Sequence, residues 1–280
     1  MNFASDTDAL QSRRTQALAA ASASTTNNMP GLHNVDLSKA RILVLTGAGV
    51  SAESGIPTFR DKDGYWRNLD PAKLATPEAF ERDPNLVWEW YRERRQRIRS
   101  AQPNAAHEAI ARLSILSREF LLVTQNVDDL HARAGVGKEK MVQIHGDIFL
   151  TRCSRCDFTH REQENPPTLH SGAAGEHEKI PKCIKCDALM RPGVVWFGEQ
   201  LDPAKIDIVE SYLACGACDV VIVAGTTATF GYIVDWALRA SGKNGQLIEV
   251  NPEKTSLSQF ATRVVREPAV IALPRLIGEL

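Results

Sequence analysis

The sequence predicts an α/β fold, in which a doubly wound parallel sheet receives a small, separately stabilised module near the middle of the chain. Short aliphatic runs alternate with helical stretches from Arg41 onward, as in the crossover units that build parallel sheets. A polar stretch over residues 151–190 interrupts this alternation and has no sustained periodicity. Cys-x-x-Cys pairs stand at both of its ends, so a bound metal ion can replace the apolar core that so short a module lacks.

The expected strands are short, mostly aliphatic and bounded by polar residues or glycine, which is typical of strands buried on both faces of a parallel sheet. They are Arg41–Thr46, Phe120–Thr124, Met141–Ile144, Val220–Ala224 and Leu247–Val250. Helices are expected over Leu86–Arg99, Ala105–Ser117 and Pro203–Ala214. We therefore expect a main domain over residues 36–150 and 191–280, with an additional helical part near 60–100, and the small module over 151–190.

Composition and charge limit the functions open to the chain. Thirty-three Lys and Arg balance 34 Asp and Glu in a chain of 280 residues, which removes the electrostatic signature of a nucleic-acid binder. No apolar run approaches the roughly 20 residues that span a bilayer. Residues 1–35, rich in Ala, Ser, Thr and Asn, lack the order of a secretory signal and predict a flexible tail. We expect a cytoplasmic protein (mitochondrial in a eukaryote) that binds neither nucleic acid nor membrane.

All six cysteines fall in Cys-x-x-Cys pairs, which in a chain without a secretory signal indicate metal or redox sites. Two pairs bracket the polar module and supply four thiolates, enough for a closed structural Zn²⁺ site. These expected ligands are Cys153, Cys156, Cys183 and Cys186. The third pair, Cys215 and Cys218, adjoins an aliphatic strand, where buried thiols are ordinary core residues. The module's histidines, His160, His170 and His177, stay open as alternative ligands.

A glycine-rich turn, Thr46–Ser51, directly follows the first expected strand. Glycines at such a place let the backbone approach a pyrophosphate, and free N–H groups at a helix start face the anion. A tight strand-to-helix connection requires the same glycines, and the third glycine of the full Rossmann spacing is displaced to Gly55. The turn alone leaves both a dinucleotide site and a structural turn open.

Polar residues follow the other expected strands, at the edge where open parallel sheets bind their ligands. They are Gln125, Asn126, Asp128, His145, Asn251 and Glu253. A histidine with an ordinary pKa of about 6.5 suits general-base chemistry. Each group also has a structural alternative: the Asn-x-Asp pattern fits a helix N-cap, the histidine a backbone-held residue, and Asn-Pro-Glu a turn.

Several blocks in one order resemble the sirtuin family of NAD-dependent protein deacylases. The blocks are GAGVSAESGIPTFR (47–60), TQNVD (124–128) with His131, IHG (144–146), the first two cysteine pairs, RPGVVWFGE (191–199), GTT (225–227) and NPE (251–253), and together they cover roughly residues 38–276. The resemblance implies a Rossmann-like domain, NAD as co-substrate, a structural Zn²⁺ and acylated lysine side chains of proteins as the partner.

The resemblance also implies roles for individual residues. His145 would deprotonate a ribose hydroxyl of NAD, while Asn126 and Asp128 serve the nicotinamide pocket. The other implied NAD-binding residues are Gly47, Ala48, Gly49, Ser51, Ile56, Phe59, Arg60, Gln125, Gly225, Thr226, Thr227, Asn251, Glu253 and Ala269. The implied substrate-binding residues are Ala75, Tyr91, Arg94, Val195, Phe197, Gly198 and Glu199. In the implied reaction the acyl oxygen of the lysine displaces nicotinamide, and water finally releases lysine and O-acyl-ADP-ribose.

The segment ATPEAF (75–80), followed by Tyr91-x-x-Arg94, resembles the class III subclass, which removes succinyl and malonyl groups. Tyr91 and Arg94 share a helical face because they are three residues apart, and a guanidinium can bind a distal carboxylate bidentately. Ala75 would leave room for the longer acyl chain. A charged, solvated helix would explain the same arginine-rich pattern.

The sequence departs from the family near Tyr232, where the family usually carries a proline. This run helps to hold a substrate peptide as an added strand, so peptide selectivity stays open. We expect a monomeric lysine deacylase that prefers succinyl and malonyl over acetyl groups. A plain deacetylase, a mono-ADP-ribosyltransferase, a hydride-transferring dehydrogenase and a non-catalytic NAD-responsive binding module are the alternatives.

Overall fold

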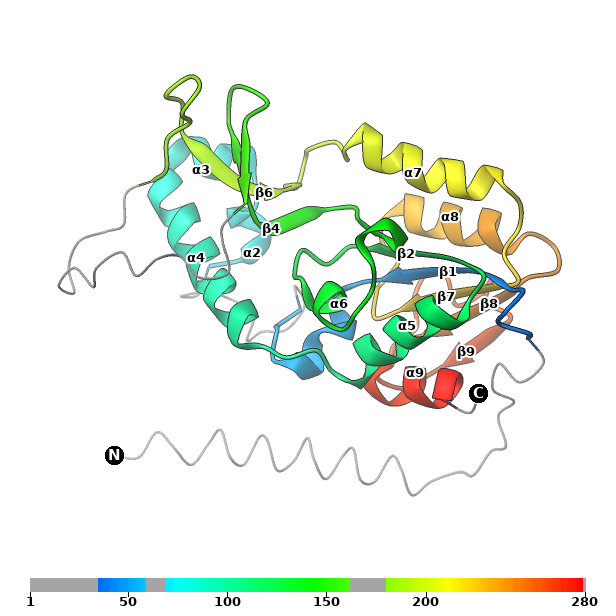
Figure 1. Cartoon of the computed structure of the whole chain (residues 1–280). Coiled ribbons are helices and arrows are strands. Elements are labelled where there is room, and N and C mark those ends of the chain that lie inside the picture. The colour runs from blue at the N-terminus through cyan, green and yellow to red at the C-terminus, as the bar shows by residue number, and fades with distance from the viewer. Residues whose placement is uncertain (1–34, 59–68, 162–179, 279–280) are drawn as a thin grey trace, which may run out of the picture. The chain divides into compact units, whose positions relative to one another are not determined.

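The computed structural model describes residues 35–58, 69–161 and 180–278, all of which belong to the compact unit Leu32–Leu280. Within this part of the chain, six parallel strands form one sheet in the order β3-β2-β1-β7-β8-β9 (Figure 1). Their bounds are β1 Arg41–Thr46, β2 Glu119–Thr124, β3 Met141–Gln143, β7 Val220–Ala224, β8 Gln246–Val250 and β9 Arg263–Val265. Numbered within the sheet, this order is 3-2-1-4-5-6, which is the doubly wound arrangement of dinucleotide-binding domains. The predicted α/β fold is confirmed.

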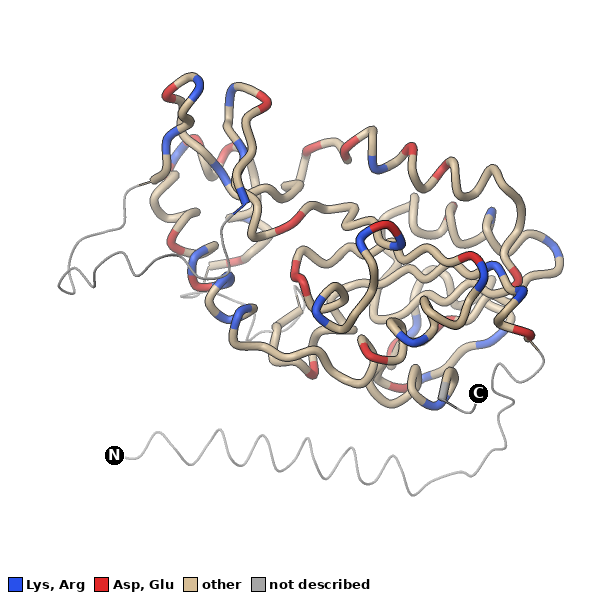
Figure 2. The backbone as a smooth tube through the Cα atoms, viewed as in Figure 1, with Lys and Arg blue, Asp and Glu red and all other residues tan. Residues whose placement is uncertain are grey.

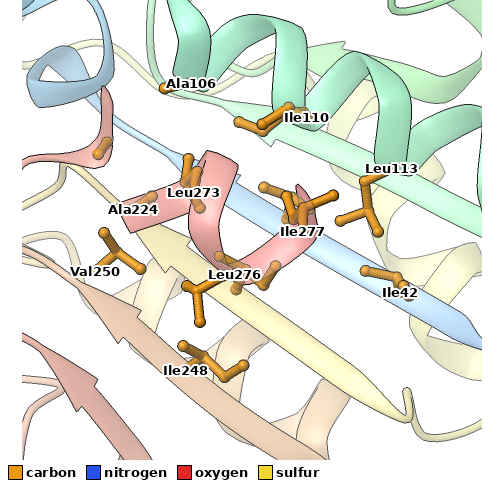
Figure 3. Packing of buried hydrophobic residues seen from close by; sticks show 14 of the residues in the cluster. Ile42, Ala106, Ile110, Leu113, Ala224, Ile248, Val250, Leu273, Leu276 and Ile277 are labelled. Atoms are coloured by element: carbon orange, nitrogen blue, oxygen red, sulfur yellow. The ribbon is translucent and has the colours of Figure 1, made fainter. Parts of the chain in front are cut away.

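Helices cover both faces of this sheet. Helices α5 (Ala105–Leu116) and α9 (Ala269–Gly278) pack on one face, and α7 (Pro203–Ala214) and α8 (Gly231–Ser241) on the other. Because side chains alternate along a strand, Ile42 of β1 belongs to the apolar cluster of α5 and α9 (Figure 3), and Leu43 belongs to the cluster of α7 and α8. Strands buried on both sides explain the continuous aliphatic runs.

A second, antiparallel sheet in the order β5-β4-β6 carries the cysteine pairs. Its strands are β4 Gly146–Cys153, β5 Thr159–Arg161 and β6 Met190–Val194. It packs with α2 (Pro71–Leu74), α3 (Pro77–Arg82) and α4 (Pro84–Ser100) around a separate apolar cluster that includes three tryptophans. Buried Arg95 of α4 fastens this layer, because its guanidinium donates to the Ile148 (2.6 Å) and Leu150 (3.0 Å) carbonyls. The predicted module boundary at residue 151 thus falls inside β4.

A polar cap and a proline begin four of the described helices. The Asp70, Thr76, Asp83 and Asp202 side chains accept backbone N–H groups at the starts of α2, α3, α4 and α7, each with proline in the first turn. The remaining short elements are the 3₁₀ turns η1 Ala48–Val50, η2 Ala52–Ser54 and η4 Lys138–Lys140, and α6 Leu130–Arg133. Acidic and basic residues are interspersed along the described backbone (Figure 2), and none of its helices is both long and apolar enough to cross a membrane.

The parallel register aligns the carboxyl ends of the central strands. Thr46 of β1 lies opposite Thr124 of β2 and Ala224 of β7, and Ala224 lies opposite Val250 of β8. The segments that leave these strands therefore meet at one edge of the sheet, where open α/β sheets bind ligands.

Candidate active site

A cavity of about 710 Å³ opens at this edge, between the ends of the parallel strands and a wall that includes helix α4 and the segment after β6. It gathers every predicted cofactor- and substrate-binding residue that the structure describes, together with the predicted base. The segments that follow the parallel strands, with the start of α9, supply Gly47, Ala48, Gly49, Ser51, Ile56, Gln125, Asn126, Asp128, His145, Gly225, Thr226, Thr227, Asn251, Glu253 and Ala269. The end of α2, helix α4 and the segment after β6 supply Ala75, Tyr91, Arg94, Val195, Phe197, Gly198 and Glu199. The predicted residues Phe59 and Arg60 lie outside the described residues.

The glycine turn after β1 packs directly against the turn after β7. The Gly47 N–H donates to the Ala224 carbonyl (3.1 Å), and the Gly49 N–H donates to the Gly225 carbonyl (2.8 Å). A side chain at Gly225, whose φ is +61°, would place its Cβ 2.5 Å from the Val50 nitrogen. The turn continues into a pair of 3₁₀ turns and not into an α-helix. These glycines therefore serve a close backbone approach, while the turn still lines the cavity.

A buried polar chain forms one wall of the cavity. The Asn126 amide donates to Ser51 Oγ (3.1 Å), which donates to Asp128 Oδ2 (2.9 Å), and the Leu130 N–H donates to Asp128 Oδ1 (3.0 Å). Burial raises the pKa of Asp128 to about 6, although these donors oppose the shift. Asp129, not Asp128, is the N-cap residue of α6. Asp128 instead forms a turn just before the helix, in which its carboxylate accepts the Leu130 N–H.

His145 stands at the carboxyl end of β3 with both ring nitrogens in contact. Its Nδ1 lies 3.0 Å from the Gln125 carbonyl oxygen and its Nε2 lies 2.6 Å from the Tyr232 hydroxyl. A carbonyl only accepts, so Nδ1 carries the proton and Nε2 holds the lone pair. Burial lowers the pKa of His145 to about 4, so the ring is neutral at pH 7. The backbone-held role and the role of a base are therefore compatible.

The loops after β2, β7 and β8 are tied to one another at the cavity. The Gln125 side-chain amide donates to Thr226 Oγ1 (2.8 Å), and the Asn251 amide donates to the Thr226 carbonyl (2.7 Å). Asn251 Oδ1 also accepts the Glu253 N–H (3.0 Å), which is the predicted Asn-Pro-Glu turn. Thr227 Oγ1 lies 2.6 Å from Thr229 Oγ1. These bonds fix the polar groups that face the cavity.

Helix α4 brings Tyr91 and Arg94 to the opposite wall. Tyr91 is buried (1% exposed), and its hydroxyl accepts from Trp196 Nε1 (3.0 Å). The Arg94 guanidinium lies over the rings of Trp90 and Tyr91, at 4.8 and 5.6 Å from their centroids. Burial lowers the pKa of Arg94, and the nearby Asp128 opposes this shift. Arg94 thus lines an aromatic cavity, and a fully solvated helix does not describe this face of α4.

The segment after β6 connects the base to the helical wall. The Val195 N–H donates to the His145 carbonyl (2.8 Å), and the Phe197 N–H donates to the Ala75 carbonyl (2.9 Å). The Glu199 carboxylate accepts from Arg191 Nη2 (2.9 Å), and Arg191 holds its pKa below the usual range. Glu199 therefore acts here as an anchor of the segment, a role that the resemblance did not imply.

The four predicted zinc ligands form one cluster. The Cys153–Cys186, Cys156–Cys183 and Cys156–Cys186 sulfur atoms lie 3.5, 3.6 and 3.7 Å apart. A tetrahedral site with Zn–S distances of about 2.3 Å places its sulfurs roughly 3.8 Å apart, so the donor set fits Zn²⁺. Among the described residues, His160 is exposed and does not join the cluster, and His170 and His177 lie outside that part. Cys218 is a core residue as predicted, whereas Cys215 is exposed because it follows the end of α7.

Comparison with known proteins supplies the family. Residues 47–230 match the model of the Sir2 family. The chain is 43% identical over 236 residues to NAD-dependent protein deacylase 1 of Archaeoglobus fulgidus, covering 84% of this chain and 91% of that protein. It is likewise 43% identical over 239 residues to the NAD-dependent protein deacylase of Aquifex aeolicus, covering 85% and 95%. This chain belongs to the Sir2 family.

Solved Sir2 structures extend the match to the fold. The NAD complex of a Sir2 homologue superposes with a TM-score of 0.76 at 41% identity, covering 87% of this Sir2 chain and 91% of the other. A Sir2–p53 peptide–NAD⁺ structure matches with a TM-score of 0.70 at 28% identity, covering 85% and 92%. The predicted resemblance to the sirtuins is therefore confirmed.

Sequence reasoning missed several residues of this Sir2 cavity. Trp196, Thr229 and Phe230 also line it, and Tyr232, noted in the sequence only as a departure from the family, contacts the predicted base. The Phe230 ring meets the His145 ring edge-on at 5.5 Å between centroids. The aromatic residues of FGY (230–232), shortly after a predicted strand, were the available signal, because aromatic side chains are common in the lining of ligand-binding pockets.

Proposed function

We propose that this Sir2 protein is an NAD-dependent protein-lysine deacylase that prefers succinyl- and malonyl-lysine over acetyl-lysine. The supporting observation is that one cavity joins a neutral imidazole with its lone pair at Nε2, a buried amide and carboxylate wall, and a partly buried guanidinium. The base and the guanidinium lie on opposite layers, so a ligand between them can be held at two ends.

The residues present fit NAD as the co-substrate. The glycine turn and Gly225 allow close backbone approach, and the Glu253 carboxylate stands at the end of β8, where acidic residues accept ribose hydroxyls. NAD supplies a ribose carbon that is open to attack once nicotinamide leaves. Asn126 and Asp128 would hold the nicotinamide carboxamide, because their polar atoms are already oriented by Ser51.

His145 supplies the proton acceptor of the proposed reaction. The Gln125 carbonyl holds the proton on Nδ1, and Nε2 can therefore take a proton from a ribose hydroxyl. A pKa of about 4 keeps His145 unprotonated at pH 7. Binding in one cavity would hold the two reactants in a fixed orientation.

Arg94 supports the preference for acidic acyl groups. Its guanidinium lines the cavity over the rings of Trp90 and Tyr91. A carboxylate at the end of a succinyl or malonyl chain could form a charged, bidentate hydrogen bond with this guanidinium, whereas an acetyl group has no carboxylate. Trp196 donates to the Tyr91 hydroxyl, whose own O–H can donate to the same carboxylate.

The test is a steady-state comparison of acetyl-, malonyl-, succinyl- and glutaryl-lysine peptides with NAD. Arg94→Met should raise KM for succinyl-lysine at least tenfold, which is the effect of losing about 1.4 kcal/mol of a charged contact, and should spare acetyl-lysine. Arg97→Met removes an exposed arginine from the same helix and should change neither KM. Equal losses on both substrates with Arg94→Met would refute the assignment of Arg94.

A further inference from the structure

We propose that Tyr232 is a positioning residue for His145: its hydroxyl donates to Nε2 in the free protein, and an incoming ribose hydroxyl must displace it. This inference rests on the proposed function, in which Nε2 is the proton acceptor. The decisive geometry is the 2.6 Å contact between Tyr232 Oη and His145 Nε2. A neutral imidazole has one acceptor nitrogen with one lone pair, so two hydroxyls cannot both donate to it.

The direction of this hydrogen bond follows from its neighbours. Because the Gln125 carbonyl fixes the proton on Nδ1, Nε2 can only accept and Tyr232 must donate. Burial raises the pKa of Tyr232, which keeps its proton on the phenol. Tyr232 thus stabilises the same tautomer that the proposed reaction needs.

Tyr232 packs against two other aromatic side chains, one of which is partly exposed. It stacks on Phe230, with 5.6 Å between ring centroids and 17° between planes, and tilts against Trp236 at 5.0 Å. Phe230 is 42% exposed and also lines the cavity. The aromatic pair begins α8, whose N-cap makes no side-chain bond.

Other groups near His145 also shift the pKa of its ring, in both directions. The ammonium of Lys205 in α7 donates to the Gln143 carbonyl (2.6 Å). Its positive charge disfavours protonation of the nearby His145 ring. The Gln125 carbonyl favours protonation, while burial disfavours it more strongly. A hydroxyl that donates to Nε2 stabilises the neutral ring, so removing it should raise the pKa of His145.

The experiment compares the wild-type protein with Tyr232→Phe by two measurements. Nitrogen-15 NMR follows the protonation of the His145 imidazole against pH, with His145→Gln to assign the signal. Isothermal titration calorimetry measures ADP-ribose binding at pH 8. Tyr212→Phe is the matched control, because it removes a hydroxyl that donates to the Ile42 carbonyl (2.8 Å) at the far end of β1.

Tyr232→Phe should raise the pKa of His145, and it should bind ADP-ribose about threefold to tenfold more tightly, since one competing hydrogen bond is gone. Tyr212→Phe should change neither quantity. An unchanged His145 pKa would show that the hydrogen bond contributes nothing and would overturn the proposal. A raised pKa with equal or weaker ADP-ribose binding would overturn the displacement. Neither measurement needs turnover, so both remain decisive if the proposed deacylation fails.

Discussion

Replacing Asp128 with asparagine should stabilise the folded protein at pH 8. Burial raises the pKa of this carboxyl from 3.8 to about 6, a shift of roughly 2 units that corresponds to about 3 kcal/mol. Asparagine removes the charge but weakens the bond from Ser51 Oγ and the bond from the Leu130 N–H, at a cost of about 1 kcal/mol. The net gain in the free energy of unfolding should be about 2 kcal/mol, or roughly 4–8 °C in Tm.

The gain should depend on pH with a definite sign. Since the pKa of Asp128 is higher in the folded state, its favourable contribution is complete below pH 3.8 and is lost as the pH rises through about 6. The advantage of Asp128→Asn should therefore shrink by roughly 1–1.5 kcal/mol between pH 8 and pH 5.

Urea denaturation at pH 8 and pH 5 measures this effect. Asp202→Asn is the control, because Asp202 caps α7 at an exposed position and asparagine caps equally well. Asp202→Asn should leave the free energy of unfolding unchanged at both pH values. An Asp128→Asn variant that is no more stable than the wild type at pH 8, or whose gain is the same at pH 5, would refute the account of a desolvated carboxylate.

Three further predictions concern the site and its frame. His145→Asn should lower kcat for deacylation at least roughly 100-fold in steady-state kinetics, while calorimetry should show a change in NAD affinity of less than about tenfold. A full loss of NAD binding would contradict the role of His145 as a base. Gly225→Ala should lower the free energy of unfolding by more than about 2 kcal/mol in urea denaturation, because its Cβ would meet the Val50 backbone. Gly55→Ala has open space around its Cβ and should lose only about 1 kcal/mol through backbone strain. Equal losses in the two variants would contradict the packing argument. Purified protein should carry one zinc per chain by elemental analysis, and Cys156→Ser should release it and lower Tm; full zinc content in that variant would exclude Cys156 as a ligand.

The parallel strands could be predicted because both of their faces are buried. An aliphatic run such as Val220–Ala224 leaves few other interpretations. The last strand and helix could not: β9 has three residues, and α9 contains Pro274, which ordinarily ends a helix. Burial of Leu273, Leu276 and Ile277 against the sheet outweighs the proline (Figure 3).

The candidate site was predictable wherever a polar residue directly follows a strand. His145 and Asn126 share one cavity because the register of the sheet, not the spacing in the sequence, aligns the ends of β2 and β3. The contact between His145 and Tyr232 depends on how α8 packs on the sheet, and no local pattern encodes that distance. Similarly, the apolar cluster of α4 and β4 joins Trp88 to residues far along the chain, and no local pattern predicts this packing.

The most direct test of the central claim is the identity of the products formed from NAD and a succinyl-lysine peptide. Mass spectrometry should detect free nicotinamide, O-succinyl-ADP-ribose and unmodified lysine peptide in equal amounts, and His145→Asn should form none of them above background. Reduced NAD would instead indicate hydride transfer, and an ADP-ribosylated peptide would indicate a transferase; either result would contradict the proposed deacylation.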